Sequence, residues 1–418
     1  MDRASLAFVM VGHVDHGKST LIGRLLCDTD SLPDGKLEEI EAAARAEGRE
    51  LEFGFVMDHL REERERGITI DTAQTFFSSP RRDYVIIDAP GHKEFIKNMI
   101  TGASQAEAAM LICSVAEGVQ EQTKRHAYVL KLLGLAQVVV AYNKMDLVGF
   151  QEAPFRRVKA DMDAFLGRLG VAPSMEVPIS ARRGDNVATR SGNMPWYDGP
   201  TILEALDVFA KIPPPTDKPL RFPVQDVYEG PEAGDGRIVV GRVESGRLER
   251  GQSLRFLPGG QVRTVREIRK YGEQDVASAE AGECIGVVLE DDGLERGQVG
   301  GPQDDLPSPT RRFHASVFWL SPTPLDLERQ ADALALKCAT QEQPCRIADM
   351  LERLDSSTLE LLPREDGRLR ETEVGELLIE TAEPVVVESF YDVQELGRFV
   401  LVRGRDVVAG GIVTRPEA

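Results

Sequence analysis

Cysteine is scarce in this chain of 418 residues, and recognisable metal-ligand spacings are missing. The five cysteines are an odd, scattered set without a C-x-x-C pair, which favours reduced thiols in a reducing compartment. The six histidines never combine with them at the spacing of a zinc site. Zinc is therefore not expected.

Long apolar runs and a surplus of positive charge are missing as well. The N-terminal apolar stretch Leu6–Val11 is short and ends at a glycine, unlike a secretory signal. No run approaches the about 20 residues that cross a bilayer. Lys and Arg number 50 against 69 Asp and Glu, a net charge of -19, which argues against holding nucleic acid through the overall field. We expect a cytoplasmic protein without a membrane partner, which would hold nucleic acid only through a local basic patch.

Strand and helix patterns alternate in the first half of the chain. The buried-strand candidates are Phe8–Val11, Tyr84–Ile87, Met110–Cys113, Val138–Ala141 and, more weakly, Val177–Ile179. Helical patterns between and after them cover Thr20–Cys27, Lys93–Gly102, Gln122–Leu133 and Pro154–Leu169. Fully apolar strands alternating with helices predict an α/β domain with a mostly parallel sheet covered on both faces.

A proline-rich break separates this region from a second kind of pattern. Residues 213–219 hold four prolines, which favours an extended linker. Beyond it, short strand patterns with glycine turns predict antiparallel β-barrels, and a second polar break covers residues 302–309. We predict an α/β domain over 1–212, a β-barrel over 220–301 and another over 310–418. The acidic stretch Glu38–Glu65 fits either a solvated helix or a partner contact.

A glycine-rich motif follows the first strand candidate and precedes a helix candidate. It fits G-x-x-x-x-G-K-[ST] and, with one further residue, consists of Gly12, His13, Val14, Asp15, His16, Gly17, Lys18, Ser19 and Thr20. Such a loop wraps backbone amides around phosphate oxygens. Lys18 places a positive charge near the β- and γ-phosphates, and Ser19 offers a hydroxyl to Mg²⁺.

Three further motifs follow in the order that a guanine-nucleotide site needs. Asp88 ends a strand candidate and can reach the magnesium shell, while Gly91 can offer an amide to a γ-phosphate. In Asn143-Lys144-Met145-Asp146, the carboxylate of Asp146 can accept two hydrogen bonds from guanine, which adenine does not offer. Ser180, Ala181 and Arg182 complete the series, with a backbone amide set against the guanine oxygen. Together the motifs predict a GTPase that binds GTP or GDP with Mg²⁺.

These motifs resemble those of the translation-factor GTPase superfamily, which includes elongation factor Tu and its 1-alpha relatives. Residues 66–71 and 88–92 carry the resemblance along with the phosphate loop. It implies a GTPase domain followed by two β-barrels. It also implies that Thr69 joins Ser19 and Asp88 around Mg²⁺ and that His92 positions the attacking water. With Lys18, Thr69 and His92 form the implied catalytic set; no arginine finger is evident, so we expect slow, partner-dependent turnover.

Three interpretations of the physiological role stay open at this point. Residues 184–188, 194–201, 220–228, 354–360, 396–402 and 408–413 resemble the GTPase large subunit of bacterial sulfate adenylyltransferase. That resemblance implies a small catalytic partner subunit that makes adenosine 5′-phosphosulfate from ATP and sulfate, and it is our leading prediction. Against it, His13 and His16 match the loop of an elongation factor. The alternatives are an elongation-factor-like GTPase that delivers aminoacyl-tRNA, and a GTP-dependent scaffold.

Overall fold

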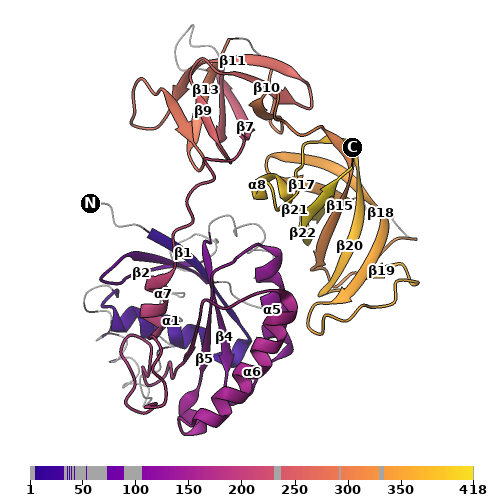
Figure 1. Cartoon of the computed structure of the whole chain (residues 1–418). Coiled ribbons are helices and arrows are strands. Elements are labelled where there is room, and N and C mark those ends of the chain that lie inside the picture. The colour runs from indigo at the N-terminus through magenta and orange to yellow at the C-terminus, as the bar shows by residue number, and fades with distance from the viewer. Residues whose placement is uncertain are drawn as a thin grey trace. The chain divides into compact units, whose positions relative to one another are not determined.

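The computed structural model describes residues 5–32, 35, 37, 39, 42, 53, 73–88, 106–229, 237–290, 293–328 and 334–417, without the side chains of Ala73 and Asp88. The helix expected over 93–102 and nearly all of the acidic stretch 38–65 lie outside these residues. The chain divides into two compact units (Figure 1). The first comprises Met1–Lys211 and Ser356–Thr358, and the second Ile212–Asp355 and Leu359–Ala418.

The first unit is built on a six-stranded sheet in the order β2-β3-β1-β4-β5-β6. All neighbouring strands pair in parallel except β2, which runs antiparallel to β3 at one edge. The strands β4 and β5 are buried along their whole length, as fully apolar sequences require. The bounds of the strands are β1 Ser5–Gly12, β2 Ala73–Ser78, β3 Asp83–Asp88, β4 Ala108–Ser114, β5 Val138–Asn143 and β6 Met175–Pro178.

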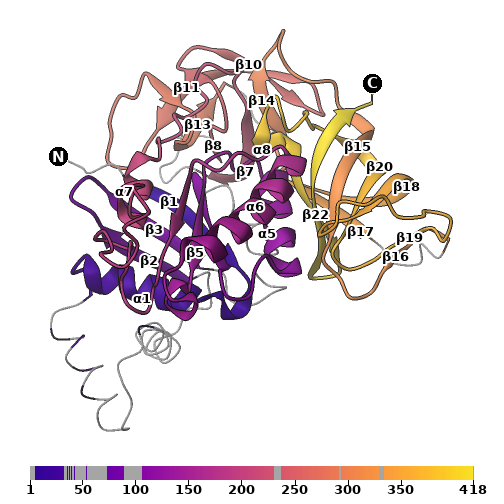
Figure 2. The same cartoon turned by 60° about the horizontal axis from the view of Figure 1, so that its bottom comes forward.

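Helices cover both faces of this sheet, as the sequence predicted (Figures 1 and 2). The helices α1 (Lys18–Asp28) and α7 (Ile202–Val208) share a core with the side chains of β1. The helices α5 (Glu121–Leu132) and α6 (Glu152–Leu169) pack against each other on the opposite face. Apolar residues at helical spacing give α6 its buried stripe, and the helix ends at Gly170, whose φ of 72° is left-handed.

The second unit contains two closed six-stranded antiparallel barrels. The first is ordered β10-β11-β13-β8-β7-β14, and its core holds Phe222, Val239, Leu254, Phe256 and Ile268. Buried and exposed side chains alternate along β8 and β10, the pattern of a sheet with one inward face. Its strands are β7 Phe222–Glu229, β8 Arg237–Arg242, β10 Ser253–Leu257, β11 Gln261–Arg269, β13 Cys284–Leu289 and β14 Val299–Pro302; β9 Arg247–Glu249 pairs with β12 Ser278–Glu280.

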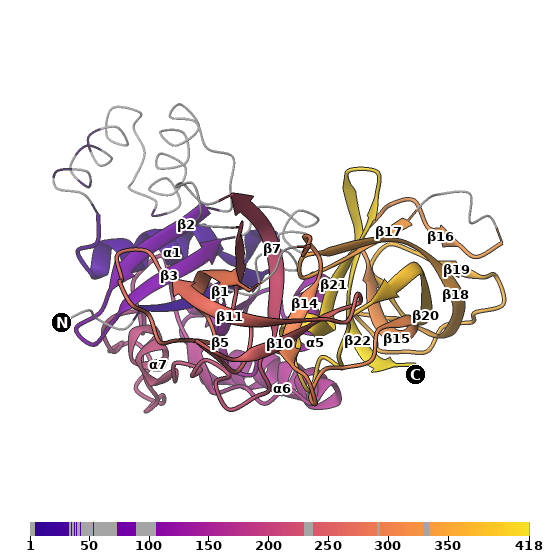
Figure 3. The same cartoon turned by 90° about the horizontal axis from the view of Figure 1, so that it is seen from above.

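The second barrel is ordered β15-β20-β18-β17-β21-β22 (Figure 3). Trp319, at the end of β15, is fully buried in its core. The barrel strands are β15 Thr310–Trp319, β17 Leu334–Cys338, β18 Gln341–Asp355, β20 Glu373–Val385, β21 Arg398–Arg403 and β22 Asp406–Pro416; α8 is Gln394–Gly397, and β16 Leu325–Asp326 pairs with β19 Arg368–Leu369. Closure of both barrels leaves their main strands without free edges.

A buried ion pair joins the two barrels. Arg221, which precedes β7, is only 2% exposed, and its guanidinium donates to both carboxylate oxygens of Glu388 at 2.7 and 2.8 Å. The same guanidinium donates to the carbonyl oxygens of Leu220 and Asp305. An apolar cluster accompanies this pair and draws Leu257 and Val299 from the first barrel and Val386, Val393 and Leu396 from the second. The junction therefore depends on a charge that has its partners in place.

Replacing Arg221 by Met should destabilise the second unit strongly, because the carboxylate of Glu388 is left buried without its cation. We expect a loss of about 3–5 kcal/mol in the free energy of unfolding. The measurement is urea unfolding of the full chain followed by Trp319 fluorescence, with Trp196→Phe as the common background. Arg311→Met is the matched control, because the Arg311–Glu383 pair is solvent-exposed. Equal effects of the two substitutions would refute the role of the buried pair.

Candidate functional site

The loop between β1 and α1 is shaped by two glycines that have positive φ and little room for a side chain. Gly12 has a φ of 151°, and a Cβ there would lie 2.4 Å from the carbonyl oxygen of Ile112. Gly17 has a φ of 89°, and a Cβ there would lie 2.5 Å from Nδ2 of Asn143. Between them, Val14–His16 form one 3₁₀ turn. The loop therefore lies close to neighbouring strands in a backbone conformation that strongly favours glycine.

The lysine of this loop closes it from the helix side. Nζ of Lys18 donates hydrogen bonds to the carbonyl oxygens of Gly12 at 2.8 Å and His13 at 3.0 Å. Ser19 and Thr20 follow in the first turn of α1. Amides in the first turn of a helix have no intrahelical acceptor and carry partial positive charge, so this end of α1 attracts anions. This geometry suits a phosphate chain, and phosphate binding by these residues stays a prediction.

Burial determines the state of His16 in the same loop. Its side chain has no exposed surface, and Nδ1 lies 3.3 Å from the carbonyl oxygen of Ile112, which makes Nδ1 the donor. Desolvation by burial lowers the pKa of the imidazole to about 4, so the ring is neutral near pH 7. Its neighbour His13 packs against it edge to face. His16 thus supports the loop from within.

Asn143, the last residue of β5, joins the phosphate loop to a second loop. Its Nδ2 donates to the carbonyl oxygen of His16 at 2.8 Å, and its Oδ1 accepts from the backbone amide of Ala181 at 2.9 Å. Three residues later, Oδ1 of Asp146 accepts from the hydroxyl of Ser180 at 2.7 Å. The loops after β1, β5 and β6 are therefore fixed to one another, and the carboxylate of Asp146 is held in one orientation.

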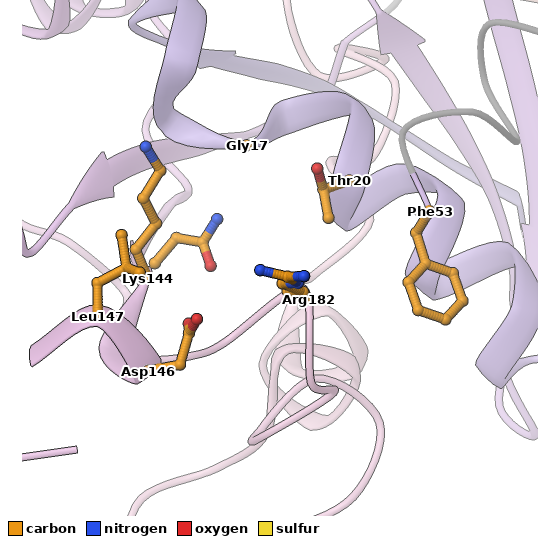
Figure 4. Close-up of a pocket in the computed structure, with 8 residues that line it drawn as sticks. Gly17, Thr20, Phe53, Lys144, Asp146, Leu147 and Arg182 are labelled. Atoms are coloured by element: carbon orange, nitrogen blue, oxygen red, sulfur yellow. The ribbon is translucent and has the colours of Figure 1, made fainter. Parts of the chain in front are cut away.

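These loops surround a pocket of about 230 Å³. Figure 4 shows Lys144, Leu147 and Asp146 on one side of the pocket and Thr20 and Phe53 on the other, with Arg182 between them. Six of its lining residues were predicted from the sequence, and Phe53 and Leu147 were not; the full lining is Gly17, Thr20, Phe53, Asn143, Lys144, Asp146, Leu147 and Arg182. The pocket lies beyond the carboxyl ends of the strands, where parallel sheets place their ligands.

The remaining predicted residues are only partly placed. Thr69, Gly91 and His92 lie outside the described residues. Asp88 ends β3, and its backbone is paired with Met10 of β1, shortly before the phosphate loop. Among the residues that the structure describes, no group of three or more His, Cys, Asp or Glu side chains is arranged to hold a metal ion. The roles assigned to these residues stay predictions.

Besides Phe53 and Leu147, the sequence analysis missed a residue that contacts the pocket lining. Glu117 follows β4, and its carboxylate accepts from Nζ of Lys144 at 2.7 Å. The signal was available, since Glu117 follows the carboxyl end of a parallel strand next to β5, as Asp146 follows β5. No sequence motif marks it, so only the strand order identifies it.

Comparison with known proteins defines first the class and then the family. The model of the elongation factor Tu GTP-binding domain matches residues 3–213, and that of the GTP-eEF1A C-terminal domain matches residues 312–414. The chain is thus a GTPase with a GTP- and GDP-binding domain. It belongs to the elongation factor Tu/1-alpha family, as the following relatives also show.

Elongation factor 1-alpha of Pyrococcus woesei is 39% identical over 99% of this chain and 97% of its own. Elongation factor 1-alpha of Methanosphaerula palustris is 35% identical over 98% of this chain and 97% of its own. Among solved structures, the match to sup35 complexed with GDP covers 100% of this chain and 95% of the sup35 chain, at 24% identity and a TM-score of 0.45.

None of the helices in the described part of the chain has the length and apolar sequence of a membrane-spanning segment.

The prediction that this chain is a sulfate adenylyltransferase subunit is wrong, and so is the prediction of a small catalytic partner subunit. Relatives that match nearly the whole chain at 35–39% identity are named elongation factor 1-alpha. Some of the residues that suggested this subunit stabilise the fold. The buried side chain of Asn186 donates a hydrogen bond to the carbonyl oxygen of Pro178 and accepts one from the amide of Ser191. Nε1 of Trp196 donates to the carbonyl oxygen of Phe150. Scaffold residues of this kind do not distinguish one member of the fold from another.

Asp146→Asn should change the base preference of the pocket from guanine to xanthine. The amide cannot accept both guanine hydrogen bonds, so GTP affinity should fall about 10- to 100-fold, while xanthosine triphosphate should bind better than in the unmodified chain. Competition against a fluorescent guanine nucleotide measures both. Asp163→Asn, a change at an exposed carboxylate on α6, is the control. Unchanged GTP preference in the Asp146 variant would show that this carboxylate does not contact the base.

Proposed function

We propose that this chain carries aminoacyl-tRNA in its GTP-bound state and releases it after hydrolysis, as an elongation factor. The full-length match to elongation factors 1-alpha is the observation that carries the proposal. A pocket of about 230 Å³, lined by Gly17 of the phosphate loop and by Asp146, supports it. Two closed barrels follow the GTPase domain and provide a surface on which a large partner can bind.

The proposed nucleotide chemistry uses the residues predicted from the sequence. Lys18 and the first-turn amides of α1 stabilise the phosphate chain. Asp146 selects guanine, with Asn143, Ser180 and Ala181 holding the loops. His92 positions the attacking water. A site made of these groups binds the nucleotide before the reaction. It also places positive charge beside the γ-phosphate oxygens, where negative charge is stabilised during hydrolysis.

A magnesium ion fits the donor chemistry at this edge of the sheet. Ser19 presents a hydroxyl in the first turn of α1. The backbone of Asp88, at the end of β3, pairs with that of Met10, which lies two residues before Gly12. Oxygen donors of this kind suit Mg²⁺, and we propose Ser19, Thr69 and Asp88 as its protein ligands. When bound, the ion would neutralise charge on the β- and γ-phosphate oxygens.

Lys18→Ala and His92→Ala should separate binding from hydrolysis. Lys18 contacts the phosphate chain in the ground state, so its loss should weaken nucleotide binding. His92 acts on the water only in the transition state, so its loss should lower the hydrolysis rate about 100-fold or more with binding nearly intact. Equilibrium binding and single-turnover hydrolysis of each variant give the two values. A His92 variant that fails to bind GTP would make His92 a structural residue.

The GTP form should protect the ester bond of aminoacyl-tRNA from hydrolysis, whereas the GDP form should not. The reason is that a carrier must bind its cargo in one nucleotide state and release it in the other. The half-life of charged tRNA is measured with the full chain and GTP or GDP, and the Lys18→Ala chain is the control. Equal half-lives in the two nucleotides would contradict cargo delivery and favour a GTP-dependent scaffold.

A further inference from the structure

The loop that follows β4 holds Glu117 rigidly at the edge of the nucleotide pocket. The backbone amide of Glu117 donates to the hydroxyl of Ser114 at 3.3 Å, and the amide of Gly118 donates to the carbonyl oxygen of Ser114. From the other side, Nε2 of Gln120 donates to the carbonyl oxygen of Glu117 at 2.7 Å. The amide of Val115 donates to the carbonyl oxygen of Asn143, which ties this loop to the end of β5.

Lys144 is the cation that faces the Glu117 carboxylate. Its Nζ donates to Oε1 of Glu117 at 2.7 Å, and this hydrogen bond is the largest influence that lowers the pKa of the carboxyl group. On the far side, Nε2 of His16 lies 3.9 Å from Oε2 of Glu117. Because the buried His16 ring is neutral, it cannot take the place of the ammonium group. The carboxylate therefore acts on Lys144.

Lys144 in turn forms part of the pocket wall. It lines the pocket between Asn143 and Asp146 and adopts a left-handed φ of 67°, a backbone conformation that is costly for a residue with a side chain. A lysine can lay its apolar stem along a flat surface while its ammonium group is held beyond it. With the ammonium group anchored on Glu117, the stem stays against one side of the pocket.

We propose that Glu117 is a positioning residue that holds Lys144 as the wall of the guanine pocket and so slows the release of the nucleotide. The inference rests on the proposed guanine site. Glu117 acts through Lys144 and touches no reacting atom. Loss of the carboxylate frees the lysine stem, and the base loses a fixed contact surface. Loss of Glu117 should therefore shorten the lifetime of the bound nucleotide, for GDP and for GTP alike.

The test is a double-mutant cycle on the dissociation rate of fluorescently labelled GDP, with Glu117→Ala, Lys144→Met and both together. Glu117→Ala should speed dissociation about three- to tenfold, a size typical of a half-exposed ion pair that also orders a side chain. In the Lys144→Met background, the same change should have no further effect. Glu152→Ala is the matched control, because this carboxylate has the same 37% exposure and pairs with Arg156 on the surface.

The outcomes separate this inference from the proposed function. Non-additive rates, with an unchanged Glu152 variant, support the positioning role. Equal acceleration by Glu117→Ala in both backgrounds would mean that Glu117 acts independently of Lys144 and would overturn it, as would an unchanged rate in the single variant. Failure of the unmodified chain to bind labelled GDP would instead refute the guanine site itself.

Discussion

A single buried amide, the side chain of Asn143, sets the geometry on which the nucleotide site depends. Its two ends have opposite hydrogen-bonding character, and each is used: one donates to the loop after β1, and the other accepts from the loop after β6. An aspartate would lose the donor, and an apolar residue would lose both. Since a Cβ at Gly17 would collide with the same amide, the two positions constrain each other. The loops therefore form one rigid frame.

The frame separates residues that build the site from residues that face the ligand. Asn143 and the neutral His16 are buried, and both ends of the Asn143 amide and Nδ1 of His16 form hydrogen bonds with backbone groups. Lys144, Asp146 and Arg182 line the pocket. Buried, hydrogen-bonded residues thus support the few polar groups that line the pocket. Because these groups are already in place, little free energy is lost in rearranging them when a ligand binds.

Sequence reasoning predicted the parts that depend on local rules. The apolar run Val138–Ala141 lies in β5, and the glycine motif forms the loop after β1. The short strand patterns separated by glycine turns form the two barrels. It did not predict β2, because this edge strand lies on only one neighbour and its mixed sequence lacks a continuous apolar run. Glu117 was missed for a different reason: its importance arises from strand order, which no short motif encodes.

The wrong prediction of a sulfate adenylyltransferase subunit has a physical cause as well. Motif segments such as residues 184–188 and 194–201 suggested a metabolic subunit, yet Asn186 and Trp196 within them stabilise the fold. Net charge is a weak basis for predicting partners, because fields in salt solution decay over about 10 Å and a partner responds to the local surface.

Calorimetric titration of the unmodified full chain with GDP and, separately, ADP in magnesium buffer tests the central claim most directly. A frame built for guanine should give saturable one-to-one binding of GDP, with an affinity for ADP at least about 100-fold lower, because adenine does not offer the Asp146 carboxylate the two donors that guanine offers. Comparable affinities for GDP and ADP would contradict the account.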